Sequence, residues 1–126
     1  MEDVLTQIDR TIQRGESVAV VGAEFHFAVA KATHNTVLAR LVRSFTHLMA
    51  KAGELMETDA GNATVFKQHE LMSHRELYRI IRLGDPQKSR QAMIDHISYS
   101  EDLILDAFKN AEGMEGGLVD LISVSD

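Results

Sequence analysis

The chain of 126 residues contains no cysteine and no tryptophan, and it has a single proline. Without cysteine it can form neither disulfides nor sulfur-ligated metal sites, and it has no thiolate nucleophile. Any transition metal would have to be held by His, Asp, Glu and water. The absence of cysteine also suits a reducing cytoplasm, where we expect the protein to work.

Basic residues are in short supply as well, because 13 Lys and Arg stand against 19 Asp and Glu, for a net charge of −6 at pH 7. The cations are scattered along the chain, which disfavours binding to the phosphates of DNA or RNA or to an anionic membrane surface. The longest uncharged stretches, such as residues 17–23, are far too short to span a bilayer. The acidic start Met1-Glu2-Asp3 is unlike a signal peptide. We therefore expect no membrane partner and no export.

Helix-breaking residues are few, and the segments between them are longer than strands usually are. Apolar residues recur at helical spacing in most of these segments, so the sequence predicts an all-α fold. The predicted helices span about residues 1–14, 16–33, 36–56, 63–83 and 86–110. The length fits one domain, which we place at residues 1–110, followed by a C-terminal tail, 111–126, that has no helical pattern long enough to predict a helix.

The third predicted helix has the clearest apolar stripe of the chain. Asn35, just before it, has a side chain suited to an N-cap. An amphipathic helix of this kind normally turns its stripe toward a core. The stripe consists of Leu38, Leu41, Val42, Phe45, Leu48, Met49, Ala52, Leu55 and Met56.

Three of the six histidines, His26, His74 and His96, each lie on the apolar face of a different predicted helix. The other three lie at a helix end, off a stripe or at its edge. A single buried imidazole is more often a hydrogen-bonded core residue than a ligand. Three in one helical core also fit a metal site, because imidazole suits Zn, Ni, Cu or Fe and bundle sites are built from facing helices. Periodicity does not say whether the three stripes converge, so both interpretations stay open.

Glu70 lies four residues before His74 and therefore on the same helical face. An inward carboxylate can bind a metal, or it can accept the N–H of a liganding imidazole and fix its tautomer. The alternative is a partly exposed Glu whose aliphatic stem packs at the edge of the stripe.

Several short motifs occur in a characteristic order: Phe25-His26, Ala32-Thr33-His34-Asn35, His74-Arg75-Glu76-Leu77, Gly84-Asp85 and His96. In this order and spacing they resemble the FadR-type C-terminal effector-binding domain, the FCD domain, of GntR-family transcription regulators. The resemblance runs from about residue 5 to residue 108. It implies an antiparallel helical bundle, with about five to six helices in this chain, that encloses a divalent metal. It also implies a small carboxylate metabolite bound against the metal, and a homodimer.

The resemblance also assigns roles to residues. By position, His26, His74 and His96 match the metal-binding histidines of the family, and the metal would be Zn, Ni or Mn. Asn35 matches the Asn that follows the first of these helices. Asn35 and Glu70 are therefore candidates for contacting the effector.

Two features depart from the family pattern. The family's metal-binding Asp lies four residues before the first His, where this chain has Gly22. Three neutral imidazoles should hold a divalent cation less tightly, unless water, an effector carboxylate or Glu70 completes the shell. In addition, no winged helix-turn-helix and no first helix of the domain precede Met1, so we expect DNA binding only through a domain absent here. The absent helix should expose an apolar groove that self-association could cover.

Three hypotheses about function follow. The favoured one is an effector-sensing domain, not an enzyme, in which a metal and a small organic acid bias the arrangement of a dimer. The second is a helical dimerisation or interaction domain whose metal site has degenerated with Gly22. The third is a metal-dependent hydrolase, because three histidines with open coordination positions resemble a catalytic zinc site. No accompanying acid/base pair, nucleophile or phosphate loop supports the hydrolase.

Overall fold

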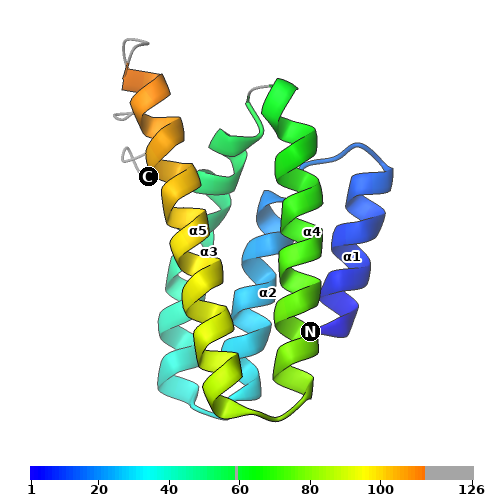
Figure 1. Ribbon diagram of the computed structural model, residues 1–126, viewed down its shortest axis with the longest axis vertical. Coiled ribbons are helices and arrows are strands. Elements are labelled where there is room, and N and C mark those ends of the chain that lie inside the picture. Colours follow the sequence, from blue (N-terminus) through cyan, green and yellow to red (C-terminus); the bar gives the residue numbers. More distant parts are fainter. Residues whose placement is uncertain (59, 113–126) are drawn as a thin grey trace.

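A computed structural model describes residues 1–58 and 60–112 of the chain, and that part contains five α-helices and no strand. Successive helices run in opposite directions (Figure 1), which confirms the all-α antiparallel bundle expected from the sequence. None of the described helices is both long enough and apolar enough to cross a membrane. The helices are α1 (Glu2–Gln13), α2 (Ala19–Ala32), α3 (Thr36–Met56), α4 (Ala60–Arg82) and α5 (Pro86–Glu112).

The helix boundaries follow local sequence signals. Gly15 and Gly84 follow α1 and α4 with positive φ of 71° each, a conformation that costs glycine little. The Asn35 side chain accepts a hydrogen bond of 3.0 Å from the Leu38 N–H and caps α3 as predicted. Asp85 caps α5 in the same way, and Pro86 occupies the first helical position, where a missing N–H costs nothing. These local signals therefore account for the helix boundaries at which they occur.

Helix α2 lies at the centre of the bundle, with α1 and α4 on one side and α3 on the other (Figure 1). It is apolar on nearly every side, as a buried helix must be. Phe25 is completely buried and packs into a core that α1 and α4 complete. The buried core residues are Leu5, Ile8, Val18, Val21, Phe25 and Leu77.

Helix α3 does not pack as its stripe predicted. It approaches α2 closely through small residues: Ala50 is buried, and a Cβ added at Gly53 would lie 3.0 Å from the Cβ of Ala19. Such a close approach leaves no room for bulky side chains, so much of the apolar stripe lies on the outside of the bundle. Four of its members, Leu38, Leu41, Phe45 and Leu48, are 37–53% exposed. We call these four residues the α3 face, and for them the expected orientation toward the core is wrong.

The last two helices largely keep the predicted orientation. On α4 the face containing Leu77 is turned to the core, and on α5 His96 is buried. Ile97 of α5, the residue after His96, is 52% exposed. Helix α5 continues to Glu112, so it includes the first two residues of the expected tail. The rest of that tail lies outside the described residues.

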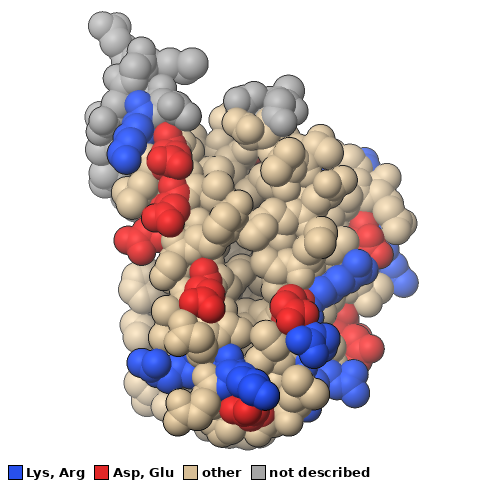
Figure 2. All heavy atoms as spheres, viewed as in Figure 1, with Lys and Arg blue, Asp and Glu red and all other residues tan. Residues whose placement is uncertain are grey.

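Charged side chains of both signs lie side by side on the face shown in Figure 2. This distribution agrees with the scattered cations of the sequence. It offers no broad basic surface on that face for nucleic acid.

Candidate metal centre

The bundle brings together the three histidines that the apolar stripes singled out. His26 comes from α2, His74 from α4 and His96 from α5. The Nε2 atom of His26 lies 3.3 Å from the Nε2 of His74 and 3.3 Å from the Nε2 of His96. The three ligand atoms all lie within 4.8 Å of one another. The three stripes, whose convergence periodicity left open, therefore meet at one point.

Burial keeps these imidazoles neutral. It lowers the pKa of His26 to about 4, with a smaller contribution from the charge of His96. Burial also lowers the pKa of His96 to about 4, with a further contribution from His69. The pKa of His74 lies well below 6.5, because the residue is buried and because His26 and His96 would repel its charge. Near pH 7 the cluster thus offers uncharged nitrogens with lone pairs, the form that binds metals.

Among the described residues, two outer nitrogens of the cluster lack the partner that a metal-bound histidine usually has. With Nε2 turned to the shared centre, a metal-bound imidazole carries its proton on Nδ1 and normally donates it to a neighbouring group. The Nδ1 atoms of His74 and His96 are buried and have no hydrogen-bond partner in the described part of the chain. Three imidazole nitrogens that meet at one point fit a divalent transition metal, and His26, His74 and His96 would be its protein ligands.

Glu70 lies at the edge of this cluster. Its Oε2 atom is 3.6 Å from the Nδ1 of His74, and its side chain is 13% exposed. Burial, and then the charge of Glu57, raise the pKa of Glu70 to about 7. The inward orientation expected from the stripe of α4 is therefore present, and only a small part of the Glu70 side chain is exposed.

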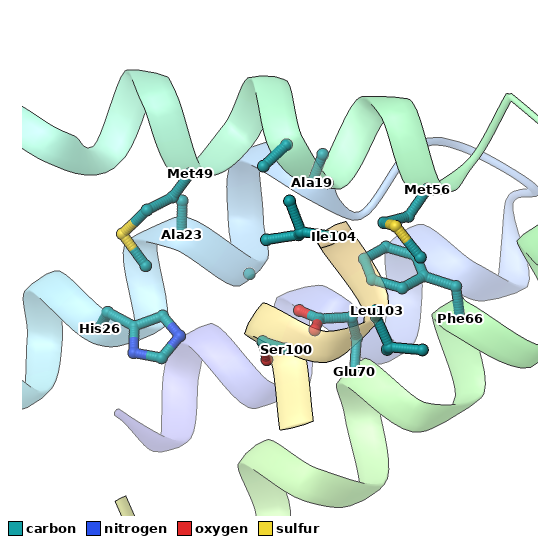
Figure 3. A pocket seen from close by; sticks show the side chains of 13 residues that line it. Ala19, Ala23, His26, Met49, Met56, Phe66, Glu70, Ser100, Leu103 and Ile104 are labelled. Carbon is teal, nitrogen blue, oxygen red and sulfur yellow. The ribbon is translucent and has the colours of Figure 1, made fainter. Parts of the chain in front are cut away.

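A cavity of about 110 Å³ opens beside His26 and Glu70. Both side chains reach its wall in Figure 3, together with Ser100, whose hydroxyl donates to the His96 carbonyl oxygen at 3.0 Å. Sequence reasoning did not place Ser100 at a site. Its position four residues after His96 was the available signal. The remaining lining is apolar and comprises Ala19, Gly22, Ala23, Met49, Ala52, Gly53, Met56, Phe66, Leu103 and Ile104.

The remaining candidates lie elsewhere. Asn35 is exposed and caps α3, and it does not line this cavity. The bundle therefore does not bring it to the histidines in the way that the resemblance implied. His34 and His47 are exposed. His69 stacks on Tyr99 beside a second cavity of about 250 Å³.

An all-α bundle whose buried centre joins imidazoles from three helices is a class of domain suited to binding metals and small ligands. The FCD domain family model matches residues 1–99, and the chain belongs to this family. No solved structure gives a significant match. FCD domains are parts of GntR-type regulators, where they sense effectors, so the family argues for regulation and against the hydrolase hypothesis.

Proposed function

We propose that this chain is the effector-sensing domain of a GntR/FadR-type transcription regulator. In this proposal His26, His74 and His96 bind a divalent transition metal, Zn, Ni or Mn, and a small organic acid binds beside it. The observation that carries the proposal is the meeting of three Nε2 atoms from three helices in a buried, uncharged cluster. The three Nε2 atoms face one another, and a divalent transition metal is the shared ligand that neutral imidazole nitrogens at one point favour.

The cavity beside the cluster supports the second half of the proposal. A carboxylate needs a positive partner, and no Lys or Arg is among the residues that line the cavity. When bound, the metal supplies that positive charge. The acid would then depend on the metal for its affinity, with its carbon skeleton against the apolar lining.

Sensing requires two arrangements that the ligands bind with different affinity. We propose that the chain works as a homodimer and that the α3 face takes part in its interface, because four large apolar side chains are exposed in one row there. DNA would be read by a separate winged helix-turn-helix domain, in the cytoplasm. The histidines join α2, α4 and α5, so metal and acid would act on the packing of the helices behind that face.

The test is calorimetry and thermal unfolding of protein purified without chelator. We expect Zn²⁺, Ni²⁺ or Mn²⁺ to bind and to raise the melting temperature. At a free metal concentration of 100 times the dissociation constant, binding should increase the free energy of unfolding by about 2.7 kcal/mol. Short mono-, di- and tricarboxylic acids should bind only to the metal-loaded protein. Absence of metal binding would contradict the metal half, and equal acid binding with and without metal would contradict the second half.

A dimerisation domain with a degenerate metal site is the alternative, and the α3 face favours it equally. The variants His26→Ala, His74→Ala and His96→Ala separate the two proposals. If each variant changes the free energy of unfolding while added metal changes nothing in the parent protein, the histidines are core residues and the alternative holds. Phe45→Glu, measured by light scattering, tests the dimer interface itself, since a charge in the α3 face should yield monomers.

A further inference from the structure

Glu70 is a largely buried acid beside the histidine cluster. Its side chain is 13% exposed, and no Lys or Arg forms an ion pair with it in the described residues. The charge that acts on its pKa is that of another carboxylate, Glu57. Burying an acid without a cation is costly, so its position calls for a positive partner that the described part of the chain does not supply.

Gly22 makes the position of this acid possible. A Cβ added at Gly22 would lie 2.6 Å from the Oε2 of Glu70 and 3.8 Å from the Cε1 of His74. Any larger residue at position 22 would therefore displace the carboxylate, which stands at the end of a flexible side chain. The carboxylate of Glu70 on α4 therefore occupies the space that a side chain at position 22 of α2 would take.

The carboxylate faces the outer nitrogen of a cluster histidine. His74 is fully buried, and its Nδ1 has no hydrogen-bond partner among the described residues, with the Oε2 of Glu70 at 3.6 Å. That distance is slightly too long for a hydrogen bond, and a small rotation of the Glu70 side chain would close it. The Nε2 of His74 points the other way, to the Nε2 of His26. An imidazole that binds a metal through Nε2 must hold a proton on Nδ1, which a carboxylate stabilises best.

We propose that Glu70 is the acidic positioning residue of the metal centre: from the space left by Gly22, its carboxylate accepts the Nδ1–H of His74 and supplies negative charge beside a divalent cation held by three neutral imidazoles. This assignment rests on the proposed metal centre. It gives Glu70 a role toward the metal in place of direct contact with the effector.

A double-mutant cycle tests the assignment, with Zn²⁺ affinity measured by calorimetry at a fixed pH. Glu70→Ala should weaken Zn²⁺ binding by about 10- to 100-fold, the usual effect of losing the group behind a liganding histidine. Glu70→Gln, which keeps an acceptor but removes the charge, should have a smaller effect. Glu76→Ala is the matched control on the exposed side of α4 and should bind Zn²⁺ like the parent.

Gly22→Ala completes the cycle. It should weaken Zn²⁺ binding in the parent protein, because its methyl group displaces the Glu70 carboxylate, and it should change nothing further in the Glu70→Ala background. A merely structural role of either residue would give additive losses instead. The double variant G22D/E70A, which moves the acid from α4 to α2, should recover part of the affinity.

A second measurement does not depend on metal. In the metal-free protein, long-range ¹H–¹⁵N spectra should place the ring proton of His74 on Nδ1, and Glu70→Ala should shift that equilibrium. If the parent chain binds Zn²⁺ and both Glu70 variants bind it equally well, the assignment is wrong while the metal centre stands. If the parent binds no Zn²⁺, the metal centre and the role of Glu70 toward it are both wrong.

Discussion

The histidine cluster and the α3 face show opposite outcomes for similar sequence patterns. His74 and His96 are ionisable residues on apolar stripes, and the bundle buries both. The α3 face is a row of large apolar side chains, and the bundle leaves it largely exposed. The difference lies in the neighbours, because α2, α4 and α5 meet over the histidines, while the closest approach of α3 to α2 is made by small residues such as Gly53. A helical stripe tells which residues share a side, but whether that side is enclosed depends on how closely the next helix approaches.

The sharpest test of this comparison uses the same substitution in both regions. Phe25 is completely buried and Phe45 is 50% exposed. Phe25→Ala should cost about 3–5 kcal/mol in the free energy of unfolding, because it leaves a cavity in the core. Phe45→Ala should cost less than about 1 kcal/mol at low protein concentration. Urea unfolding followed by circular dichroism measures both. Equal losses would mean that Phe45 is as enclosed in solution as Phe25.

The next largest effect concerns the histidines themselves. His74→Ala should weaken Zn²⁺ binding by more than about 100-fold, since removing a ligand costs more than removing its outer partner. His47→Ala on the exposed surface of α3 is the control and should leave the affinity unchanged. Calorimetric titration with Zn²⁺ measures both affinities. Similar affinities of His74→Ala and His47→Ala would show that the buried cluster holds no metal.

Lowering the pH should reduce the free energy of unfolding through the buried histidines of the cluster, whereas the apolar side chains of the α3 face do not titrate. Burial holds the pKa of His26 and of His96 at about 4 in the folded protein, below the ordinary value of 6.5. As pH falls through this window, the unfolded chain takes up protons that the folded chain excludes, so the metal-free protein should lose stability. Urea midpoints between pH 7 and 4.5 measure the loss.

Glu70 changes the free energy of unfolding with pH in the opposite direction. Its pKa is raised from 4.5 to about 7, so in that interval the folded protein holds a proton that the unfolded chain has released. Its contribution to stability is complete below the ordinary pKa of 4.5 and is lost as the pH rises through the pKa of about 7 in the folded protein. Three histidines outweigh one carboxyl, so stability should still fall toward acid. Glu70→Gln should make that fall steeper, and an unchanged slope would show that Glu70 does not titrate in this interval.

The smallest effect is expected at the junction of the two regions. Asn35→Ala removes the cap of α3 and should cost about 1 kcal/mol, whereas Asn35→Ser should keep most of it. Neither change should alter binding of metal or organic acid, because Asn35 does not line the cavity. A large loss of acid binding in Asn35→Ala, restored only by Asn, would instead support the effector contact that the family resemblance suggested.

Most of the architecture could be predicted from the chain because its signals are local. Asn35, Asp85 and Pro86 act through hydrogen bonds and dihedral limits within one helical turn, so they mark helix starts in any surroundings. The start of α2 was predicted too early, at Glu16 instead of Ala19. There the Val18 N–H donates to Glu57, 39 residues away, at 2.9 Å. A partner so distant in sequence leaves no local signal.

The candidate site divides in the same way. The stripes identified His26, His74, His96 and Glu70, since helical periodicity alone puts them on apolar faces. Periodicity could not show that the three rings meet, and it could not exclude Asn35. Periodicity also could not show what lies against Gly22, which the comparison with the family pattern identified only as the position of an absent Asp. The structure shows instead that the space at Gly22 is occupied by the Glu70 carboxylate.

The sequence by itself thus determined the helices, their order, their family and the three imidazoles, because these depend on spacing along the chain. Only the tertiary structure decided that the imidazoles share one centre, that Glu70 stands beside Gly22, and that the α3 face is left exposed. The physical reason is that each of these facts depends on the distance between helices. That distance is set by the smallest side chains at each crossing, as at Gly53 and Ala19, and no pattern on a single helix records it.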